Sequence, residues 1–332
     1  RDDVESRGLG DVYKRQGRVY ENKIFGRDVM GEILMQAFSF VAIIILGYVL
    51  RSRGFFKEED FYVISRIVLK ITLPAAIVSN FSGMSLEPSM LLISLLGLGG
   101  GVILIGTAWL ISAGKSKEER AFSILNMSGY NIGNFTMPFV QSFLGPAGIV
   151  ATSLFDSGNS FICLGGAYSI ASMAKGEGGG FKIRTIFKTL LKSVPFDAYL
   201  LMTVLSLLHL SLPAPVVSFT KIIANGNAFM AMLMIGVGFK LSGNREQIGK
   251  IVKILSARYA VSIVLALAFY FLLPFPLEYR QALVILCFSP IASAAPAFTG
   301  DLKGDVGLAS AVNSISIVVS IVLIVAVLLL IL

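Results

Sequence analysis

The chain has 332 residues, of which 55% are hydrophobic and only 14% are charged, and its formal net charge is +8. With a mean hydropathy of +0.79 it has too little polar surface to coat a soluble globule, so lipid must surround most of it. The basic residues lie in short loops between apolar stretches and lack interleaved aromatic residues, which argues against nucleic acid as a partner. Alternating strand patterns are absent, which argues against a barrel.

Residues 1–30 differ from the rest of the chain. Their first half has neither the apolar core nor the cleavage site of a signal peptide. We interpret residues 1–30 as a non-native or disordered extension and leave them out of the functional interpretation.

Apolar segments of roughly 20 residues, the length that a helix needs to cross a ~30 Å hydrocarbon core, follow from residue 31 onward. They predict an all-α polytopic membrane protein with ten transmembrane helices. The predicted helices lie at about 32–52, 60–82, 88–113, 119–142, 146–174, 190–211, 214–240, 248–273, 278–300 and 304–332.

A glycine-rich, basic stretch at 175–189 divides the chain into halves, 31–174 and 190–332, and is predicted to be a cytoplasmic linker. The halves share weak similarities at an offset of about 160 residues, such as Glu118–Arg120 with Glu278–Arg280. Five helices per half is an odd number, so the second half must enter the membrane from the opposite side. The sequence therefore predicts a 5+5 inverted repeat, which is typical of secondary transporters.

Loop charges provide a separate test of this topology. Lysine and arginine concentrate in the loops that follow the odd-numbered helices, and the opposite face has almost none. By the positive-inside rule the odd-numbered loops are cytoplasmic, which places both termini outside. We expect a multi-pass protein of the bacterial inner membrane.

Two of the predicted spans contain residues that interrupt a helix. Proline removes a backbone donor and glycine weakens a helix by roughly 1 kcal/mol, and non-helical backbone at this depth needs a protein or water-filled environment. Two half-helix N-termini brought together would favour an anion, although a pair of proline kinks that only pack is the alternative. The predicted substrate-binding residues are Asn131, Gly133, Asn134 and Pro138 in helix 4, and Ser289, Pro290, Ser293 and Pro296 in helix 9.

Asp156 lies near the middle of the fifth helix, where an ionisable side chain is unfavourable unless it has a function. We predict that it couples transport to a proton or cation, with Asn159 beside it and Asn313 at the matching depth of the tenth helix. A neutral carboxyl that holds helices together is the alternative. Four glycines in the third helix, by contrast, are predicted to permit close helix packing, namely Gly97, Gly99, Gly100 and Gly101.

The sequence resembles the auxin efflux carrier superfamily, which includes bacterial malonate and malate permeases and plant PIN-type carriers. Besides the two interruptions, the resemblance rests on Gly47-Tyr48, Phe55–Asp60, Leu73-Pro74-Ala75, Val194-Pro195 and Ile235–Gly238. It implies a fold like that of sodium/bile-acid symporters, with helices 1, 2, 6 and 7 as a scaffold and the others as a transport domain. It also implies that the crossed, discontinuous helices 4 and 9 form the substrate site. Two positions depart from the family pattern: Ala228-Phe229, where proline is frequent, and the charged Asp156.

Together these features predict a secondary active transporter of small organic anions such as carboxylates, working by alternating access. The alternatives are a sodium-coupled organic anion symporter and a non-transporting membrane sensor. Because no acidic or histidine cluster lies inside the membrane beyond Asp156, we expect no enzyme activity, no metal site and no cofactor. The expected partners are the substrate and the lipid bilayer; oligomeric state is left open, a homodimer included.

Overall fold

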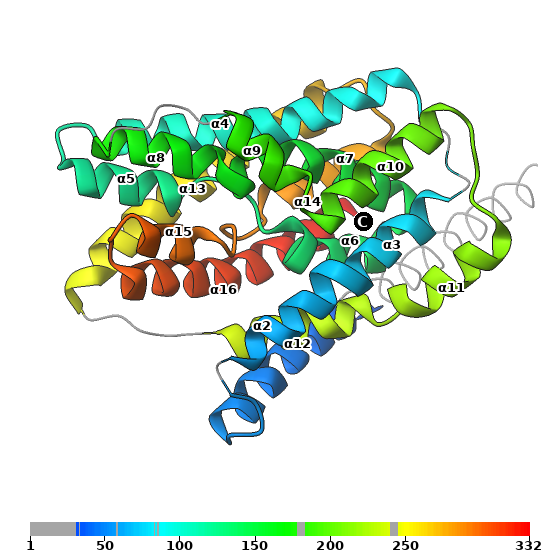
Figure 1. The fold of residues 1–332 in the computed structure, drawn as a ribbon, viewed down its shortest axis with the longest axis horizontal. Helices are drawn as coiled ribbons and strands as arrows, with labels where there is room; N and C mark the ends of the chain where they lie inside the picture. The colour runs from blue at the N-terminus through cyan, green and yellow to red at the C-terminus, as the bar shows by residue number, and fades with distance from the viewer. Residues whose placement is uncertain are drawn as a thin grey trace, which may run out of the picture.

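The computed structural model describes residues 31–32, 34–57, 59–82, 84, 86–177, 183–239 and 245–332, with the backbone alone at 245 and 246. These residues form helices and no strand, which confirms the predicted all-α class (Figure 1). The predicted extension at 1–30 and residues 178–182 of the predicted linker lie outside the described ranges.

Seven helices in the described part of the chain are long and apolar enough to cross a membrane. An eighth span results if helices α9 (Ile183–Leu190) and α10 (Val194–Leu207), which meet at a bend of 80°, count as one. The seven spans are Leu34–Ser52, Asp60–Phe81, Pro88–Ile111, Gly145–Lys175, Ala214–Gly238, Gln247–Leu272 and Val306–Ile331.

Several spans change helix type along their length. Pro74 lacks a backbone N–H, and the turn that precedes it is a π-helix. The spans divide into α2 (Asp60–Ile67), η1 (Val68–Thr72) and α3 (Leu73–Phe81); η2 (Pro88–Leu91) and α4 (Leu92–Ile111); α7 (Gly145–Phe161), η4 (Ile162–Gly166) and α8 (Ala167–Lys175); α11 (Ala214–Ala224) and α12 (Asn227–Gly238); α13 (Arg245–Leu272); and α16 (Val306–Ile331).

The predicted segments 119–142 and 278–300 are interrupted. In the first, α5 (Lys117–Leu125) ends and the chain is non-helical until η3 (Ile132–Thr136) and α6 (Met137–Phe143). In the second, α14 (Leu277–Cys287) is followed by a non-helical stretch and then by α15 (Ala295–Asp301). Below, residues 126–131 are called the first interruption and residues 288–294 the second.

Part of the predicted linker is helical. Ile183, Ile186, Phe187 and Leu190 recur at helical spacing along α9, and Ile186 and Leu190 are buried. Helix α9 packs against α7 and η4. The apolar face of α9 is short and follows directly on the glycine-rich residues. Their composition makes the helix hard to recognise in the sequence.

Helices α4 and α7 touch through glycine. A Cβ atom on Gly97 would lie 2.0 Å from the carbonyl oxygen of Phe155, and one on Gly158 would lie 1.8 Å from that of Ser94. The obstacles are backbone atoms, so no change of rotamer relieves them. The predicted close packing holds at Gly97, but Gly99 faces open space.

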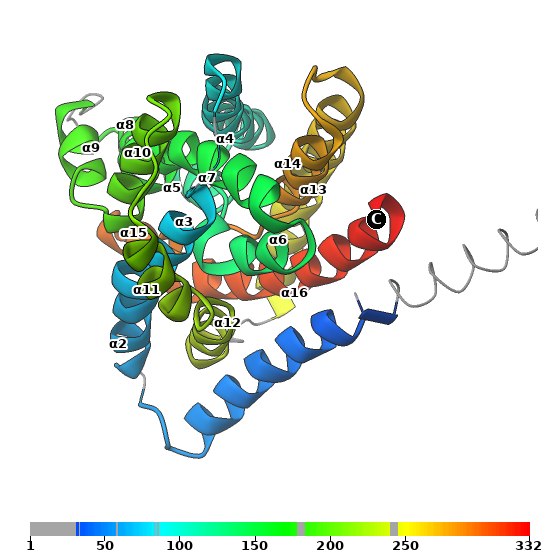
Figure 2. The ribbon, with the colours of Figure 1, turned by 90° about the vertical axis from the view of Figure 1, so that its right-hand side faces the viewer.

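A second glycine contact joins Leu34–Ser52 to α12. A Cβ atom on Gly236 would lie 2.1 Å from the carbonyl oxygen of Ile44, and one on Gly47 would lie 2.6 Å from that of Leu233. Leu34–Ser52 is otherwise at the margin of the bundle, as Figure 2 shows. The contact with α12 therefore attaches it to the rest of the protein.

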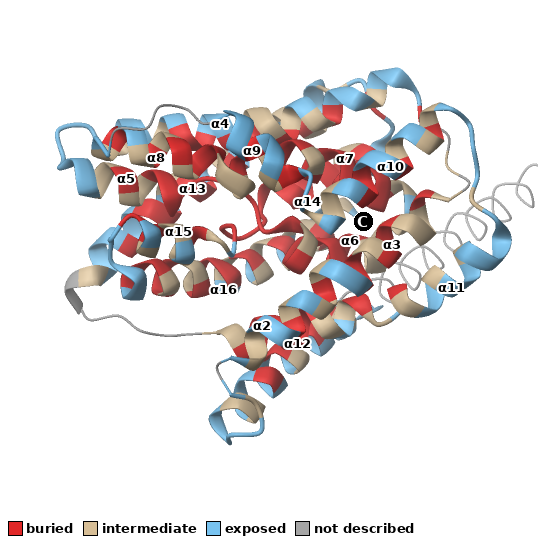
Figure 3. Cartoon of the chain, in the orientation of Figure 1, coloured by how far each residue is buried: buried red, intermediate tan, exposed pale blue. Residues whose placement is uncertain are grey.

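Buried residues concentrate in the middle of the molecule, where α6, α7 and α14 meet (Figure 3). Exposed apolar side chains such as Phe38, Leu110 and Ile222 lie on the outer faces of the helices. This distribution suits a protein whose periphery contacts lipid. It also places the two interruptions deep inside protein, because Asn126, Met127, Ser289 and Ile291 are fully buried.

The glycine contact between α4 and α7 yields a test with a matched control. We expect Gly97→Ala to lower the free energy of unfolding by about 1–3 kcal/mol or more, because the methyl group overlaps backbone. Gly99→Ala, two residues along α4, has open space and should leave stability unchanged or raise it by up to about 1 kcal/mol, since alanine favours a helix more than glycine does. Thermal unfolding of the purified variants measures both. Equal melting temperatures would contradict the proposed contact.

Candidate functional site

The two interruptions meet at a place called the crossing below, and residues of η3, which follows the first interruption, add hydrogen bonds to the second. The backbone N–H of Asn131 donates to the carbonyl oxygen of Pro290 at 2.9 Å. The hydroxyl of Thr136 donates to that of Ser289 at 2.6 Å, and the amide of Asn134 donates to the hydroxyl of Ser293 at 3.4 Å. Residues about 160 positions apart in the sequence thus form one polar centre.

Helix α7 holds the first interruption through Asn159. The side-chain oxygen of Asn159 accepts from the N–H of Tyr130 at 3.0 Å, and its amide nitrogen donates to the Tyr130 carbonyl at 2.8 Å. The same nitrogen donates to Oδ1 of Asp156 at 2.8 Å, and the hydroxyl of Tyr199 on α10 donates to Oδ2 at 2.8 Å. One buried amide therefore replaces the helical hydrogen bonds that Tyr130 lacks and connects it to the predicted coupling residue.

Helix α16 holds the second interruption in a similar way. The amide of Asn313 donates to the carbonyl oxygens of Ile291 and Ala292 at 3.1 and 3.3 Å. The hydroxyl of Ser316 accepts from the N–H of Ile291 at 3.2 Å. Asn159 and Asn313, which the sequence places at matching depths, thus have matching tasks.

A buried arginine joins the interruptions from α13. The guanidinium of Arg258 donates to the carbonyl of Met127 in the first, and to those of Ser289 and Pro290 in the second at 3.0 and 3.3 Å. Its Cζ lies 5.0 Å from the centre of the Tyr130 ring. Arg258 is 0% exposed, and no carboxylate among the described residues pairs with it. The site therefore contains a buried positive charge whose hydrogen-bond partners, within the described part of the chain, are backbone carbonyl oxygens.

The sequence-based prediction missed Arg258. Helices α5 and α14 end immediately before the carbonyls that it binds, and a cation is favoured at the C-terminal end of a helix dipole. The signal was present, because an arginine in the apolar segment 248–273 is as unfavourable as the aspartate of the fifth helix.

A cleft of about 490 Å³ reaches the crossing. Four predicted site residues line it: Asn131, Ser293, Pro296 and Asn313. Its charged lining residues are Arg51 and Asp301. The guanidinium of Arg51 donates to the carbonyl of Val237 at 2.8 Å, at the end of α12, and the side chain remains partly exposed.

The other predicted substrate residues lie behind this cleft. Pro138, Ser289 and Pro290 are buried and do not line it. A Cβ atom on Gly133 would lie 2.7 Å from Leu73 and 3.6 Å from Oδ2 of Asp156, so this glycine allows η3 to approach α3 and α7. Of the predicted set, the cleft thus gathers one residue of the first broken helix and two of the second, together with Asn313.

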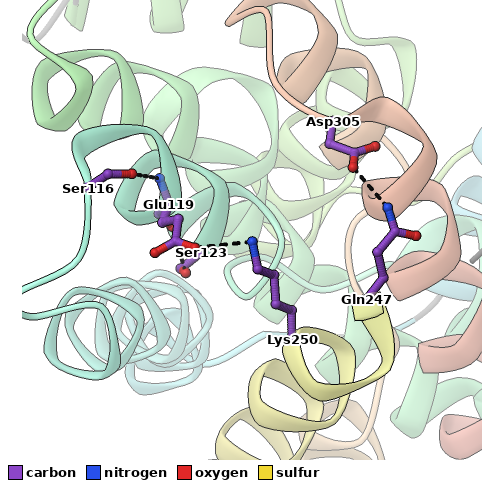
Figure 4. Close-up of polar contacts among 6 residues, drawn as sticks. All are labelled: Ser116, Glu119, Ser123, Gln247, Lys250 and Asp305. Atoms are coloured by element: carbon purple, nitrogen blue, oxygen red, sulfur yellow. Dashed lines mark hydrogen bonds and ion pairs between the residues drawn. The ribbon is translucent and has the colours of Figure 1, made fainter. Parts of the chain in front are cut away.

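A second cleft, of about 470 Å³, lies away from the crossing between the ends of α4, α5, α13 and α16. Lys250 on α13 forms an ion pair with Glu119 on α5 at 3.1 Å, and Gln247 donates to Asp305 at 3.0 Å (Figure 4). Lysines and carboxylates line its wall in equal number, and we interpret these contacts as links between the helices. No three His, Cys, Asp or Glu residues of the described ranges could together hold a metal ion.

The chain is similar to known proteins along most of its length. Residues 32–331 match the model of a family described as membrane transport protein. The chain is also 22% identical over 294 residues to an uncharacterized transporter of Methanothermobacter thermautotrophicus, a match that covers 86% of this chain and 93% of that protein.

Arg258 provides a test of how the site is held. We expect Arg258→Gln to lower the free energy of unfolding by about 2–5 kcal/mol, because buried carbonyls in both interruptions lose their donors. Arg258→Lys should be intermediate, since it keeps the charge but not the planar fork. Thermal unfolding in detergent measures the losses.

The matched control is Arg280→Gln. Arg280 also donates to a carbonyl, that of Tyr270 at 2.8 Å, and lies near the Tyr270 ring, but it contacts neither interruption. A loss of stability no larger for Arg258→Gln than for Arg280→Gln would contradict the role given to Arg258.

Proposed function

This chain belongs to the membrane transport protein family, and we propose that it is a secondary active transporter that carries small organic anions by alternating access. The family consists of transporters and not of enzymes, and the chain is an integral, multi-pass membrane protein. The match agrees with the resemblance to the auxin efflux carrier superfamily. The narrower likeness to malonate and malate permeases remains part of the proposal.

The cleft at the crossing is the observation that carries the proposal. A substrate in it would meet the polar side chains of Asn131, Ser293 and Asn313 and the cationic Arg51. The buried charge of Arg258 lies behind the same crossing and adds to the positive potential. Asp301, the other charged lining residue, is exposed, so solvent screens its charge more than that of the buried Arg258. The combination therefore favours a small anion over a neutral or cationic solute.

We further propose ten membrane spans in a 5+5 inverted repeat. The interrupted helices are then spans four and nine, and the bent pair is span six. The equivalent use of Asn159 and Asn313 supports this arrangement, because each holds the interruption of its own half.

The direction in which the cleft opens follows from its lining. Arg51, Gly238 and Asp301 lie at the ends of the predicted first, seventh and ninth spans, and Phe61 and Val306 at the starts of the second and tenth. Every one of these positions adjoins an odd-numbered loop. With those loops cytoplasmic and both termini outside, the structure corresponds to an inward-facing state.

Two bodies would move against each other. The contact of Leu34–Ser52 with α12 belongs to the scaffold, and the contact of α4 with α7 belongs to the transport domain. The cleft lies between these bodies, since Arg51 and Val237 come from the first and Asn131 and Ser293 from the second. Sliding of the transport domain would carry the crossing from one side of the membrane to the other.

A thermal-shift screen of dicarboxylates and of indole and other aromatic acids on the purified protein identifies the substrate class. Stabilisation by carboxylates and not by amines of similar size supports the proposal. A response to amines alone would overturn it. Binding without uptake into proteoliposomes would favour a membrane sensor, and a strict requirement for Na⁺ would favour a sodium-coupled symporter.

Arg51 tests the anion preference. Arg51→Gln removes the cation of the cleft, and the loss of a charge-assisted contact should weaken carboxylate binding by roughly tenfold or more. The exposed Arg53 does not line the cleft, so Arg53→Gln should change binding by less than about twofold. Binding to both variants is measured by calorimetry. Equal carboxylate affinities of the Arg51→Gln and Arg53→Gln variants would show that Arg51 does not contribute to binding.

Asp156 is proposed as the residue that couples transport to protons. Asp156→Asn keeps the size of the side chain but cannot bind and release a proton. Its amide oxygen can still accept from Asn159, while its NH2 group would donate to Tyr199 in the way a protonated carboxyl would. We expect uptake driven by a pH gradient in proteoliposomes to be lost while substrate binding persists. Unchanged pH-driven uptake would refute this coupling. Asp156 would then be a neutral carboxyl that holds helices together.

A further inference from the structure

The carboxylate of Asp156 has two donors from different helices. Asn159, on the same helix, donates to Oδ1, and Tyr199 of α10 donates to Oδ2, each at 2.8 Å. Asp156, Asn159 and Tyr199 are all at least nine-tenths buried. In the proposed arrangement α7 belongs to the transport domain and α10 to the scaffold, so the second bond joins the two bodies.

The two donors differ in whether they can remain hydrogen-bonded to Asp156 once its carboxylate is protonated. The amide nitrogen of Asn159 can only donate, and it already donates to both Asp156 and the carbonyl of Tyr130. A proton on Oδ1 would face this donor and force the amide to turn, which would break its bonds to Tyr130. The hydroxyl of Tyr199 can either donate or accept. A proton on Oδ2 can therefore be accommodated while the hydrogen bonds between Asn159 and Tyr130 of the first interruption stay in place.

Tyr199 also reaches a separate opening. A cleft of about 220 Å³ between α4, α7 and α10 is lined by Tyr199 together with Ser157 and Thr203. The hydroxyl hydrogen can turn away from Asp156 by rotation about the Cζ–O bond alone, without any movement of the ring. This cleft does not include the residues that line the cleft at the crossing.

We propose that Tyr199 is a positioning residue for proton coupling: its hydroxyl directs the exchanged proton to Oδ2 of Asp156. This inference rests on the proposed function. A hydronium ion loses one O–H bond and becomes water, a new O–H bond forms at Oδ2 of Asp156, and the carboxylate becomes neutral. The Tyr199 hydroxyl then turns from donor to acceptor. Release reverses each step. Asn159 keeps its hold on Tyr130 in both states, so the crossing stays intact while its charge environment changes.

No other described group competes for this role. Among the described residues, no titratable or charged side chain other than Tyr199 hydrogen-bonds to the carboxylate of Asp156. Other buried titratable or charged groups nearby are Tyr130 of the first interruption, Cys163 of η4, Arg258 of α13 and Cys287 of α14. Asp197, two residues before Tyr199 on α10, is exposed.

The first test is infrared difference spectroscopy of purified protein between acidic and neutral pH, which needs no substrate. Wild type should show the C=O band of a protonated carboxyl that is missing in Asp156→Asn. In Tyr199→Phe that band should move in frequency, because Oδ2–H has lost its acceptor. Tyr259→Phe is the matched control, since it removes a buried hydroxyl bonded to Ser316 and Ser320 and should leave the band in place. An unmoved band in Tyr199→Phe would overturn the inference.

The second test is transport, with radiolabelled malonate as the probe and a pH-sensitive dye inside the vesicles. For Tyr199→Phe we expect malonate-dependent proton flux to fall by roughly tenfold, equivalent to about 1.4 kcal/mol. Malonate binding at fixed pH should stay within about twofold of wild type. Unaltered proton flux would overturn the role of Tyr199 and leave the proposed transporter standing.

Two further outcomes separate the inference from the proposed function. If pH-driven uptake is undiminished in Asp156→Asn, Asp156 does not couple transport to protons. The role proposed for Tyr199 would then be refuted as well. If Tyr199→Phe does not fold, a fluorinated tyrosine at position 199 keeps the size of the side chain and makes the hydroxyl more acidic. It should displace the pH profile of malonate uptake, and an unchanged profile would count against the inference.

Discussion

The contact of the Arg258 guanidinium with both interruptions is the interaction on which the rest of the site depends. A break in a membrane-buried helix leaves carbonyl groups without partners, and each unpaired group is unfavourable there by several kcal/mol. Arg258 supplies donors to three such carbonyls, two of them in one interruption and one in the other. Its charge is itself expensive to bury, but it lies at the C-terminal ends of α5 and α14, where the helix dipoles favour it. The breaks and the arginine therefore stabilise each other, and neither is stable in this position alone.

Side chains from continuous helices complete the support. Asn159 on α7 and Asn313 on α16 each hold one interruption, and Arg258 on α13 holds both. Irregular backbone at the crossing is thus fixed by three regular helices, which keep the polar groups of Asn131 and Ser293 in place. A site of this kind can move through the membrane as a unit without having to be reassembled at each end of the transport cycle. That property is what the proposed movement of the transport domain requires of the proposed substrate site.

The sequence predicted the interruptions because proline, glycine and asparagine disturb a helix locally, and a local disturbance is visible in a single segment. It predicted Asp156 because one charge in an apolar segment is conspicuous, and the same rule applied to Arg258 would have found that residue too. The role of Tyr199 could not have been predicted this way, since a tyrosine in an apolar helix is unremarkable until its partner 43 positions away is known. Helix α9 was missed because its eight residues follow directly on the glycine-rich linker. The continuous spans number seven in the described chain, so ten spans hold only if the broken and bent helices are counted as crossing.

The glycine contacts limit where the proposed movement can occur. Backbone touches backbone between α4 and α7, and again between Leu34–Ser52 and α12, so neither pair can slide without passing through a steric overlap. Displacement must then occur at the surface between the two bodies, where the cleft lined by Arg51 and Asn131 opens and where Tyr199 meets Asp156. A change in the cleft and a change at the Asp156 hydrogen bond are consequences of the same displacement. In the proposed mechanism, substrate access and proton exchange are therefore linked by geometry, without a separate pathway of communication between them.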